Sequence, residues 1–252
     1  MSVSSTLTPE KAMPDNAGPE QTNPQQPKRF SFNHGAWLWI ALAVIPIVAV
    51  LAFAILQPVK VRPRMGLAPG YVFTDMKGSD VTSEDMRGKL VFYNFTYAGC
   101  GDGCPQTTKT MAEIQKLVGR LDTGGLPVEF VTISFDPDRD TPQRLAELAA
   151  SVGADTGSWR FVTGPAERLK NVIGGGFNVF YQPDGAGGFT FDPTIVMVDG
   201  NGIVRGVYER TMPDMATVAR DVGLLATEVK NSTGPGKLVY EAAHLFLCYP
   251  KS

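Results

Sequence analysis

The spacing of apolar residues divides the chain into segments of different character. Residues 1–34 hold mostly Ser, Thr, Pro, Asn and Gln. Such a segment cannot bury enough apolar surface to offset its ordering entropy, so we expect it to be disordered. Residues 35–56 form an apolar run of 22 residues without a charge, about 33 Å long as a helix. This length predicts a transmembrane anchor, and the run is longer than the apolar part of a cleaved signal peptide. Basic residues lie on both sides of the run, so the positive-inside rule does not set its orientation.

Residues 67–225 alternate between patterns typical of strands and of helices. Continuous β-branched and aromatic runs predict buried strands, and apolar residues three and four apart predict helices with one inner face. The expected strands are Lys89–Tyr97, Val128–Ser134, Trp159–Val162, Thr194–Asp199 and Ile203–Tyr208. The expected helices begin at Pro105 and Pro142 and span Glu167–Ile173 and Met215–Leu225. The last two strands flank a Gly-Asn-Gly turn and form a hairpin. This order predicts an α/β sandwich around a mixed sheet.

The remaining residues, 226–252, form a C-terminal tail. The tail contains the linker "NSTGPG" and ends in "KLVYEAAHLFLCYPKS", whose first part is rich in helix formers. Tyr240, His244 and Cys248 are four residues apart and therefore share one stripe of the expected helix.

Composition narrows the kind of protein. The net charge is −2 and no run of Lys or Arg occurs, which argues against a nucleic-acid partner. Three cysteines in 252 residues are too few for a disulfide scaffold. Two of the three, Cys100 and Cys104, are only four residues apart, and this proximity favours a chemical role.

The cysteine pair lies between the end of an expected strand and the start of an expected helix. The positive end of a helix stabilises a thiolate there, whereas Asp102 between the two cysteines acts in the opposite direction. Three intervening residues let the thiols meet as a disulfide or open around one ion. Thiolates are soft ligands that favour Cu(I). We do not expect a closed zinc site, because the chain holds only one further cysteine and two histidines, far from the pair in sequence. A structural disulfide, or two buried thiols, stays open as an alternative.

Four sequence blocks together resemble one protein family. The blocks are "FYNFTYAGCGDGCP", "FVTISFDPDRDTP", "GFNVFYQP" and "TIVMVDGNG", in that order. The sequence looks like the Sco/SenC proteins, which are membrane-anchored, thioredoxin-like copper proteins of cytochrome c oxidase assembly. The resemblance implies a thioredoxin-like sandwich over residues 67–225, with Cys100 and Cys104 as Cu(I) ligands and redox pair. It also implies a single-pass protein of the cytoplasmic membrane whose globular domain faces the periplasm. The implied partner is the oxidase subunit that carries the binuclear copper site.

The chain departs from the family pattern at one position. The family's third copper ligand is a histidine eight residues before the Asp that ends the late strand, and here that position is Phe191. Pro193 and the threonine after it resemble the proline–threonine pair that faces the cysteines in ordinary thioredoxins. His244 or Cys248 is a candidate third ligand, and the alternative is that the tail covers the domain or touches the bilayer.

The loop after the second expected strand is rich in acidic residues. Asp136, Asp138, Arg139 and Asp140 could suggest a separate metal site. We instead expect Asp140 or Thr141 to cap the following helix and Arg139 to pair locally, since such residues before a helix are commonly caps.

Three functions remain as hypotheses. The first is a copper-handling assembly factor that passes Cu(I) from Cys100 and Cys104 to an oxidase subunit. The second is a thiol–disulfide oxidoreductase in which Cys100 attacks the disulfide of another periplasmic thiol-redox protein and Cys104 resolves the mixed disulfide. The third is a membrane-tethered binding module with a structural disulfide. Because disulfide exchange needs no metal, the first two can coexist in one protein.

Overall fold

The computed structural model describes residues 34–56, 61–101, 106–209 and 213–232. The chain divides into two units, Met1–Ala49 and Val50–Ser252. Helix α1, His34–Leu56, has 23 residues, contains Pro46 and crosses this division. A search of the described residues finds no helix long and apolar enough to span a membrane. The anchor expected over residues 35–56 therefore stays a prediction, and the segments expected to be a disordered N-terminus and a tail lie mostly outside the described residues.

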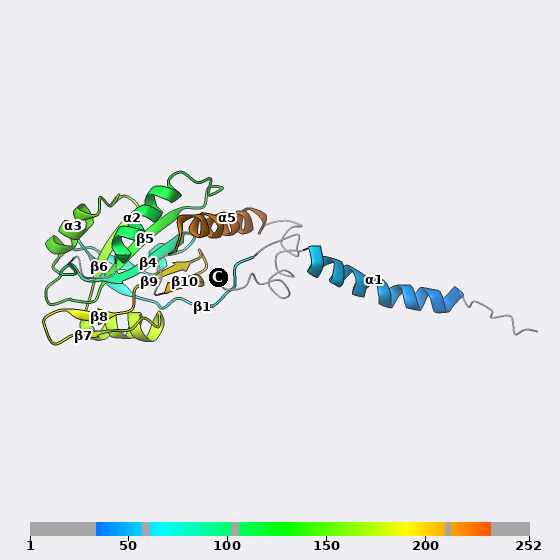
Figure 1. The fold of residues 1–252 in the computed structure, drawn as a ribbon, viewed down its shortest axis with the longest axis horizontal. Helices are drawn as coiled ribbons and strands as arrows, with labels where there is room; N and C mark the ends of the chain where they lie inside the picture. The colour runs from blue at the N-terminus through cyan, green and yellow to red at the C-terminus, as the bar shows by residue number, and fades with distance from the viewer. Residues whose placement is uncertain (1–33, 57–60, 102–105, 210–212, 233–252) are drawn as a thin grey trace, which may run out of the picture. The chain divides into compact units, whose positions relative to one another are not determined.

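The second unit is built on a sheet of eight strands in the order β1-β10-β9-β4-β5-β6-β2-β3 (Figure 1). Strands β4, β5 and β6 are parallel, and the other neighbours are antiparallel. The strands are β1 Gly66–Leu67, β2 Val72–Asp75, β3 Asp80–Thr82, β4 Leu90–Thr96, β5 Val128–Ser134, β6 Trp159–Thr163, β9 Thr194–Val198 and β10 Ile203–Glu209. A separate ribbon pairs β7, Tyr181–Pro183, with β8, Phe189–Phe191. The predicted α/β sandwich with a mixed sheet is confirmed.

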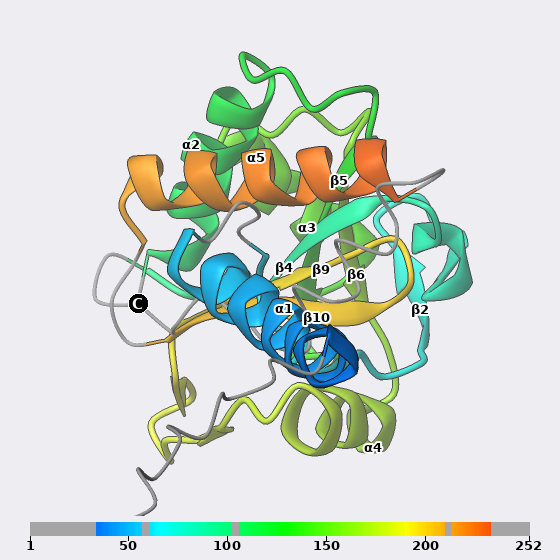
Figure 2. The same ribbon diagram turned by 90° about the vertical axis from the view of Figure 1, so that its right-hand side faces the viewer.

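Helices cover both faces of the sheet. Helices α2 (Thr107–Val118), α3 (Pro142–Ser151) and α5 (Met215–Asn231) pack on one face. Helix α4 (Ala166–Leu169) and the π-helical segment η2 (Lys170–Gly176) pack on the other, and η1 (Glu84–Met86) is a short 3₁₀ turn. In Figure 2, α2 and α5 lie on one side of the sheet and α4 on the other.

The central strand β4 contributes to a core on each face because successive side chains of a strand point in opposite directions. Phe92 belongs to the core under α2, α3 and α5, where its ring stacks on Phe130 at 5.5 Å. Tyr93 and Phe95 belong to the other core, where their ring centroids lie 5.0 and 5.2 Å from that of Phe177. All seven residues of β4 are buried, which explains why this strand is apolar or aromatic at every position except Asn94 and Thr96.

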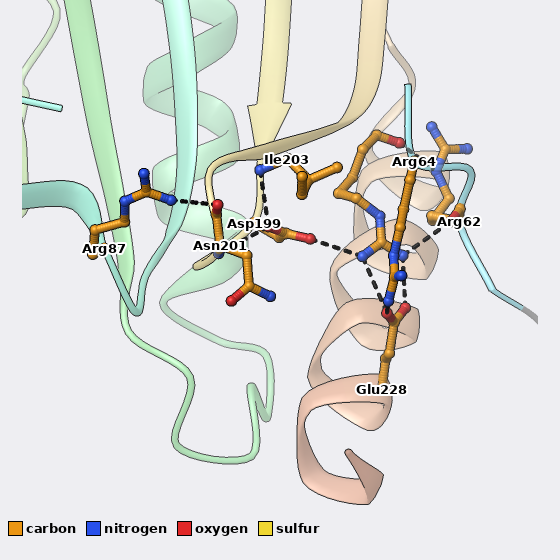
Figure 3. A network of polar contacts seen from close by, with 8 residues as sticks. Arg62, Arg64, Arg87, Asp199, Asn201, Ile203 and Glu228 are labelled. Atoms are coloured by element: carbon orange, nitrogen blue, oxygen red, sulfur yellow. Dashed lines mark hydrogen bonds and ion pairs between the residues drawn. The ribbon is translucent and has the colours of Figure 1, made fainter. Parts of the chain in front are cut away.

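A buried charge network joins α5 to the sheet at the end where β4 begins. The Arg205 guanidinium donates to Asp199 Oδ2 at 2.9 Å, to Glu228 Oε2 at 2.6 Å and to the Arg62 carbonyl at 2.9 Å. Arg205 is 2% exposed, and Arg62 adds an ion pair to Asp221 at 3.4 Å. In Figure 3, dashed lines join Asp199 and Glu228 to the same guanidinium group, beside the segment that carries Arg62. The network therefore ties together β10, α5 and the segment that leads into the sheet.

The structure differs from the sequence expectations at several ends of elements. Helix α2 begins at Thr107, two residues after the expected start. The three glycines 174–176 do not end their helix but continue it as π-helical η2. Helix α5 runs to Asn231, six residues further than expected. Strands β1, β2, β3, β7 and β8 were not predicted, since two to four residues are too few for a periodic pattern.

Candidate functional site

Cys100 lies in a turn directly after β4. Its backbone N–H donates to the Tyr97 carbonyl at 3.1 Å, and this hydrogen bond closes the Tyr97–Cys100 turn. The side chain is half-buried, packs against the core and is disulfide-bonded. Cys104, which we predicted to be its redox partner, lies outside the described residues. His244 and Cys248, the candidate third ligands, also lie outside them.

The start of α2 lies beside Cys100, as expected for a strand-to-helix junction. A cavity of about 80 Å³ is lined by Cys100 together with Gln106, Thr108 and Lys109. Gln106 is the N-cap residue of α2 but makes no side-chain capping bond, and the first turn carries no acidic side chain. The positive end of the helix is thus close to the sulfur, and it favours a thiolate when the disulfide is reduced.

Aromatic rings surround the site on the side opposite α2. We call Tyr97, Phe135, Tyr181, Phe189 and Phe191 the aromatic cluster. Phe191 is 7% exposed, and its ring lies 5.1 Å from that of Phe135 and 6.4 Å from that of Tyr97. Cys100 packs against the same hydrophobic core. At the position of the family histidine the structure therefore places a ring without a ligand atom.

The loop between β5 and α3 confirms one capping residue and assigns another role to its neighbour. Thr141 is the N-cap of α3 and accepts a hydrogen bond from the Arg144 N–H at 3.4 Å. Asp140 does not cap the helix. Its Oδ2 atom accepts the Ala98 N–H at 2.7 Å and the Ser134 hydroxyl at 2.5 Å. The carboxyl thus bonds to the backbone of the Tyr97–Cys100 turn.

Charge and burial distinguish the acidic residues of this loop. Asp140 is 1% exposed, and burial raises the pKa of its carboxyl, although hydrogen bonds from Ser134 and Ala98 oppose the rise. Arg139 forms the expected local ion pair with Asp136 at 2.5 Å and also lies over the Phe189 ring at 5.9 Å. Asp138 is exposed. Sequence reasoning missed the contact between Asp140 and Ala98, because the two residues are 42 positions apart.

Few of the described side chains near Cys100 are suited to coordinate copper. Within the described ranges, no group of three or more His, Cys, Asp or Glu side chains lies together as a metal site would need. The Cys100 sulfur is a soft atom suited to Cu(I), but its disulfide must be reduced before it can coordinate. The thioether of Met197 is also soft, but this residue of β9 is fully buried in the core under α2, α3 and α5. His34, the remaining histidine, begins α1.

Comparison with known proteins identifies the family. The family model described as SCO1/SenC matches residues 60–227. The chain belongs to the SCO1/SenC family. The match covers the whole sheet, and the expected thioredoxin-like fold of Sco proteins is confirmed by structural neighbours.

Individual Sco relatives are similar over part or most of their length. The "SCO1 protein homolog" of Bacillus subtilis is 29% identical over 94 residues, which are 37% of this chain and 47% of the relative. The chain thus spans about half the length of that relative. The crystal structure of a SCO1/SenC family lipoprotein from Bacillus anthracis is 27% identical with a TM-score of 0.58, covering 66% of this chain and 99% of that one. Arabidopsis thaliana ScoI, solved with copper bound, is 21% identical with a TM-score of 0.54, covering 65% and 98%. This last likeness supports the fold alone.

Proposed function

We propose that this Sco protein handles copper for cytochrome c oxidase assembly through a reversible dithiol at Cys100 and Cys104. The observation that carries the proposal is the disulfide-bonded Cys100 at the junction of β4 and α2. In the reduced state two thiolates would hold Cu(I), a soft ion suited to sulfur, as cargo for the oxidase subunit with the binuclear copper site. Membership in the SCO1/SenC family supports this role.

Copper loading of the reduced full-length protein in detergent tests the proposal. We expect about one Cu(I) per chain, retained against dialysis, and loss of binding in Cys100→Ser and in Cys104→Ser. Cys248→Ser and His244→Ala are the matched comparisons, because they probe the tail without touching the pair. X-ray absorption identifies the copper ligands in each variant. If the wild type and both tail variants show two sulfur ligands, the tail is not part of the site. If the wild type shows an imidazole ligand that His244→Ala lacks, the tail belongs to the site. Wild-type protein that binds no copper would contradict the proposal.

A second function, thiol–disulfide exchange without copper, is favoured by Phe191. Its ring replaces the nitrogen ligand of the family pattern and makes the surroundings of Cys100 apolar. In this reaction the Cys100 thiolate attacks a partner disulfide and releases one partner thiolate. The Cys104 thiolate then attacks the Cys100 sulfur, which releases the second partner thiol and leaves the protein disulfide. Reduction of a model disulfide by copper-free protein, abolished in Cys100→Ser, would support this function. If the double Ser variant instead loses its cooperative unfolding transition, the disulfide is structural and neither chemistry holds.

We also propose that α1 anchors the protein in the cytoplasmic membrane, with residues 61–232 on the periplasmic side. The helix carries no acidic residue in its first turn and no basic residue in its last. Large apolar side chains along it are exposed, among them Trp39 at 74% and Ile55 at 79%. We expect extraction by detergent but not by alkaline carbonate, and a mature N-terminus before residue 35. A mass-spectrometric N-terminus near residue 60 would contradict the anchor.

A further inference from the structure

We propose that Asp140 is a positioning residue for the redox disulfide: its carboxyl holds the Tyr97–Cys100 turn in the geometry that favours the bonded state of Cys100. This inference rests on the proposed thiol-redox function. It gives Asp140, the third aspartate of the Asp-Pro-Asp-Arg-Asp loop, a task in that chemistry, distinct from helix capping, which Thr141 performs.

The contacts of Asp140 connect the end of strand β5 to the Tyr97–Cys100 turn. Ser134, which donates to Asp140 Oδ2 at 2.5 Å, is the last residue of β5 and pairs in register with Thr96 at the end of β4. The same oxygen accepts the Ala98 N–H at 2.7 Å, two residues before Cys100. The Asp140 backbone N–H donates in turn to the Asp136 carbonyl at 2.9 Å. The carboxyl is therefore fixed on one side and holds the turn on the other.

Burial of the Asp140 carboxyl is energetically unfavourable, and packing alone does not explain why the residue is buried. The residue is 1% exposed, and among the described residues its Oδ1 atom is buried without a hydrogen-bond partner. Tyr97 and Gly99 line a cavity of about 450 Å³ together with Asp140 and Arg144. Unsatisfied buried polar atoms are rare in proteins, and a redox or catalytic role is one of the explanations for them. One carboxyl oxygen of Asp140 has no partner among the described residues, and the other is bonded to the Tyr97–Cys100 turn. We infer from this arrangement that the carboxyl serves to position Cys100.

The position of a thiol determines how readily it forms a disulfide within the same chain. Two groups held in a reactive geometry behave as if their concentration were very high, and freedom in one of them lowers that effective concentration. The Tyr97–Cys100 turn is closed by the bond from the Cys100 N–H to the Tyr97 carbonyl and held from outside by Asp140. Loss of the Asp140 contact should loosen the turn and shift the equilibrium from disulfide toward dithiol.

Equilibration of the copper-free, full-length protein in detergent with glutathione tests the inference. In this balanced exchange the protein disulfide and two reduced glutathione molecules give the protein dithiol and one oxidised glutathione, and alkylation followed by mass spectrometry measures the ratio. We expect Asp140→Ala to shift the equilibrium about tenfold toward dithiol, equivalent to about 30 mV. Asp140→Asn keeps an oxygen that can accept the Ala98 N–H, and should stay within about threefold of wild type. Asp138→Ala, at an exposed position of the same loop, is the matched control and should stay within about twofold.

Two results with the Asp140 variants would contradict the inference. If Asp140→Ala stays within twofold of wild type, or if Asp140→Asn shifts as far as Asp140→Ala, the hydrogen bond to Ala98 does not set the equilibrium. If Asp140→Ala fails to fold, Ser134→Ala removes only the hydroxyl that fixes the carboxyl and should shift the equilibrium about threefold in the same direction. No shift in that variant would overturn the inference. A wild-type protein whose Cys100 is never reduced by glutathione would overturn the proposed function itself.

Discussion

At the scale of single residues, Phe191 stands where we expected the histidine of the family pattern. The ring is buried in the aromatic cluster, near the Cys100 turn, and offers no electron pair to a metal. Two thiolates alone would leave Cu(I) with low coordination, and a third donor should hold it more tightly. This position therefore offers a direct way to alter the affinity of the site.

We predict that Phe191→His tightens Cu(I) binding by at least about tenfold, equivalent to about 1.4 kcal/mol. The substitution should also lower the free energy of unfolding by about 1–3 kcal/mol, because it places a polar ring in an apolar cluster. Competition with a Cu(I) chelator measures the affinity, and X-ray absorption should show a new nitrogen. Phe189→His makes the same change two residues earlier on the same strand and is the control. Equal affinities in wild type and Phe191→His would contradict the prediction.

The sequence made some of these residues predictable and not others. Cys100 was singled out because cysteines are scarce and Cys104 is close to it in sequence, although Cys104 itself lies outside the described residues. Thr141 and the pair of Arg139 with Asp136 were found because helix starts and local ion pairs depend on neighbours in the chain. The Asp140–Ala98 contact could not be found in this way, since it depends on how β4 and β5 align.

At the scale of elements, α5 illustrates how a helix start depends on one side chain. Asp214 is its N-cap and accepts the Thr217 N–H and the Thr217 hydroxyl, each at 2.8 Å. The bond from the Thr217 N–H holds the pKa of the Asp214 carboxyl below its usual value. A carboxyl whose pKa is lower in the folded state stabilises the fold at pH values above its unfolded pKa, about 3.9. That contribution is lost as the pH falls through the lowered folded pKa.

We therefore predict that Asp214→Ala lowers the melting temperature at pH 6 and that this difference from wild type narrows as the pH is lowered below 4. Thermal unfolding followed by circular dichroism across this range measures the effect. Asp138→Ala, which removes an exposed carboxylate that caps no helix, should show no such pH-dependent difference. A difference that is constant with pH would mean that the ionised cap is not the cause.

Elements were predictable in proportion to their length and pattern. Strands β4, β5, β6, β9 and β10 and helix α3 were found within a residue or two, since each carries a continuous or periodic apolar run. Helix α5 continues past Leu225 because Ala226 and Glu228 are also buried, and no Gly or Pro interrupts this stretch. Glycines 174–176 were expected to stop a helix, but a π-helical segment accommodates them on the sheet.

At the scale of the whole domain, the Arg205 network joins segments that are far apart in the sequence. Arg205 bonds to two carboxylates, Asp199 and Glu228, from a strand end and a helix. We predict that Arg205→Ala lowers the free energy of unfolding by about 3–5 kcal/mol, because it removes the buried guanidinium that pairs with two buried carboxylates. Urea unfolding measures the change. Glu84→Ala, which breaks an exposed pair with Arg87, is the control and should cost less than about 1 kcal/mol. Equal effects of the two variants would mean that the buried network contributes no more than a surface pair.

The buried segment at residues 61–62 has a consequence for how the protein can be divided. Val61 and Arg62 are buried in the domain, and Arg62 donates to the Arg205 carbonyl at 3.2 Å beside the start of β4. Cys100 follows the other end of β4, roughly 20 Å away along a strand of seven residues. The segment that carries Arg62 and the turn that carries Cys100 thus lie at opposite ends of β4. A protease that cuts before Val61 should release a diffusible domain with working thiols, whereas a cut after Arg64 should release one that has lost Arg62 and unfolds more easily. If α1 anchors the protein as proposed, the site of cleavage decides whether the released domain stays folded.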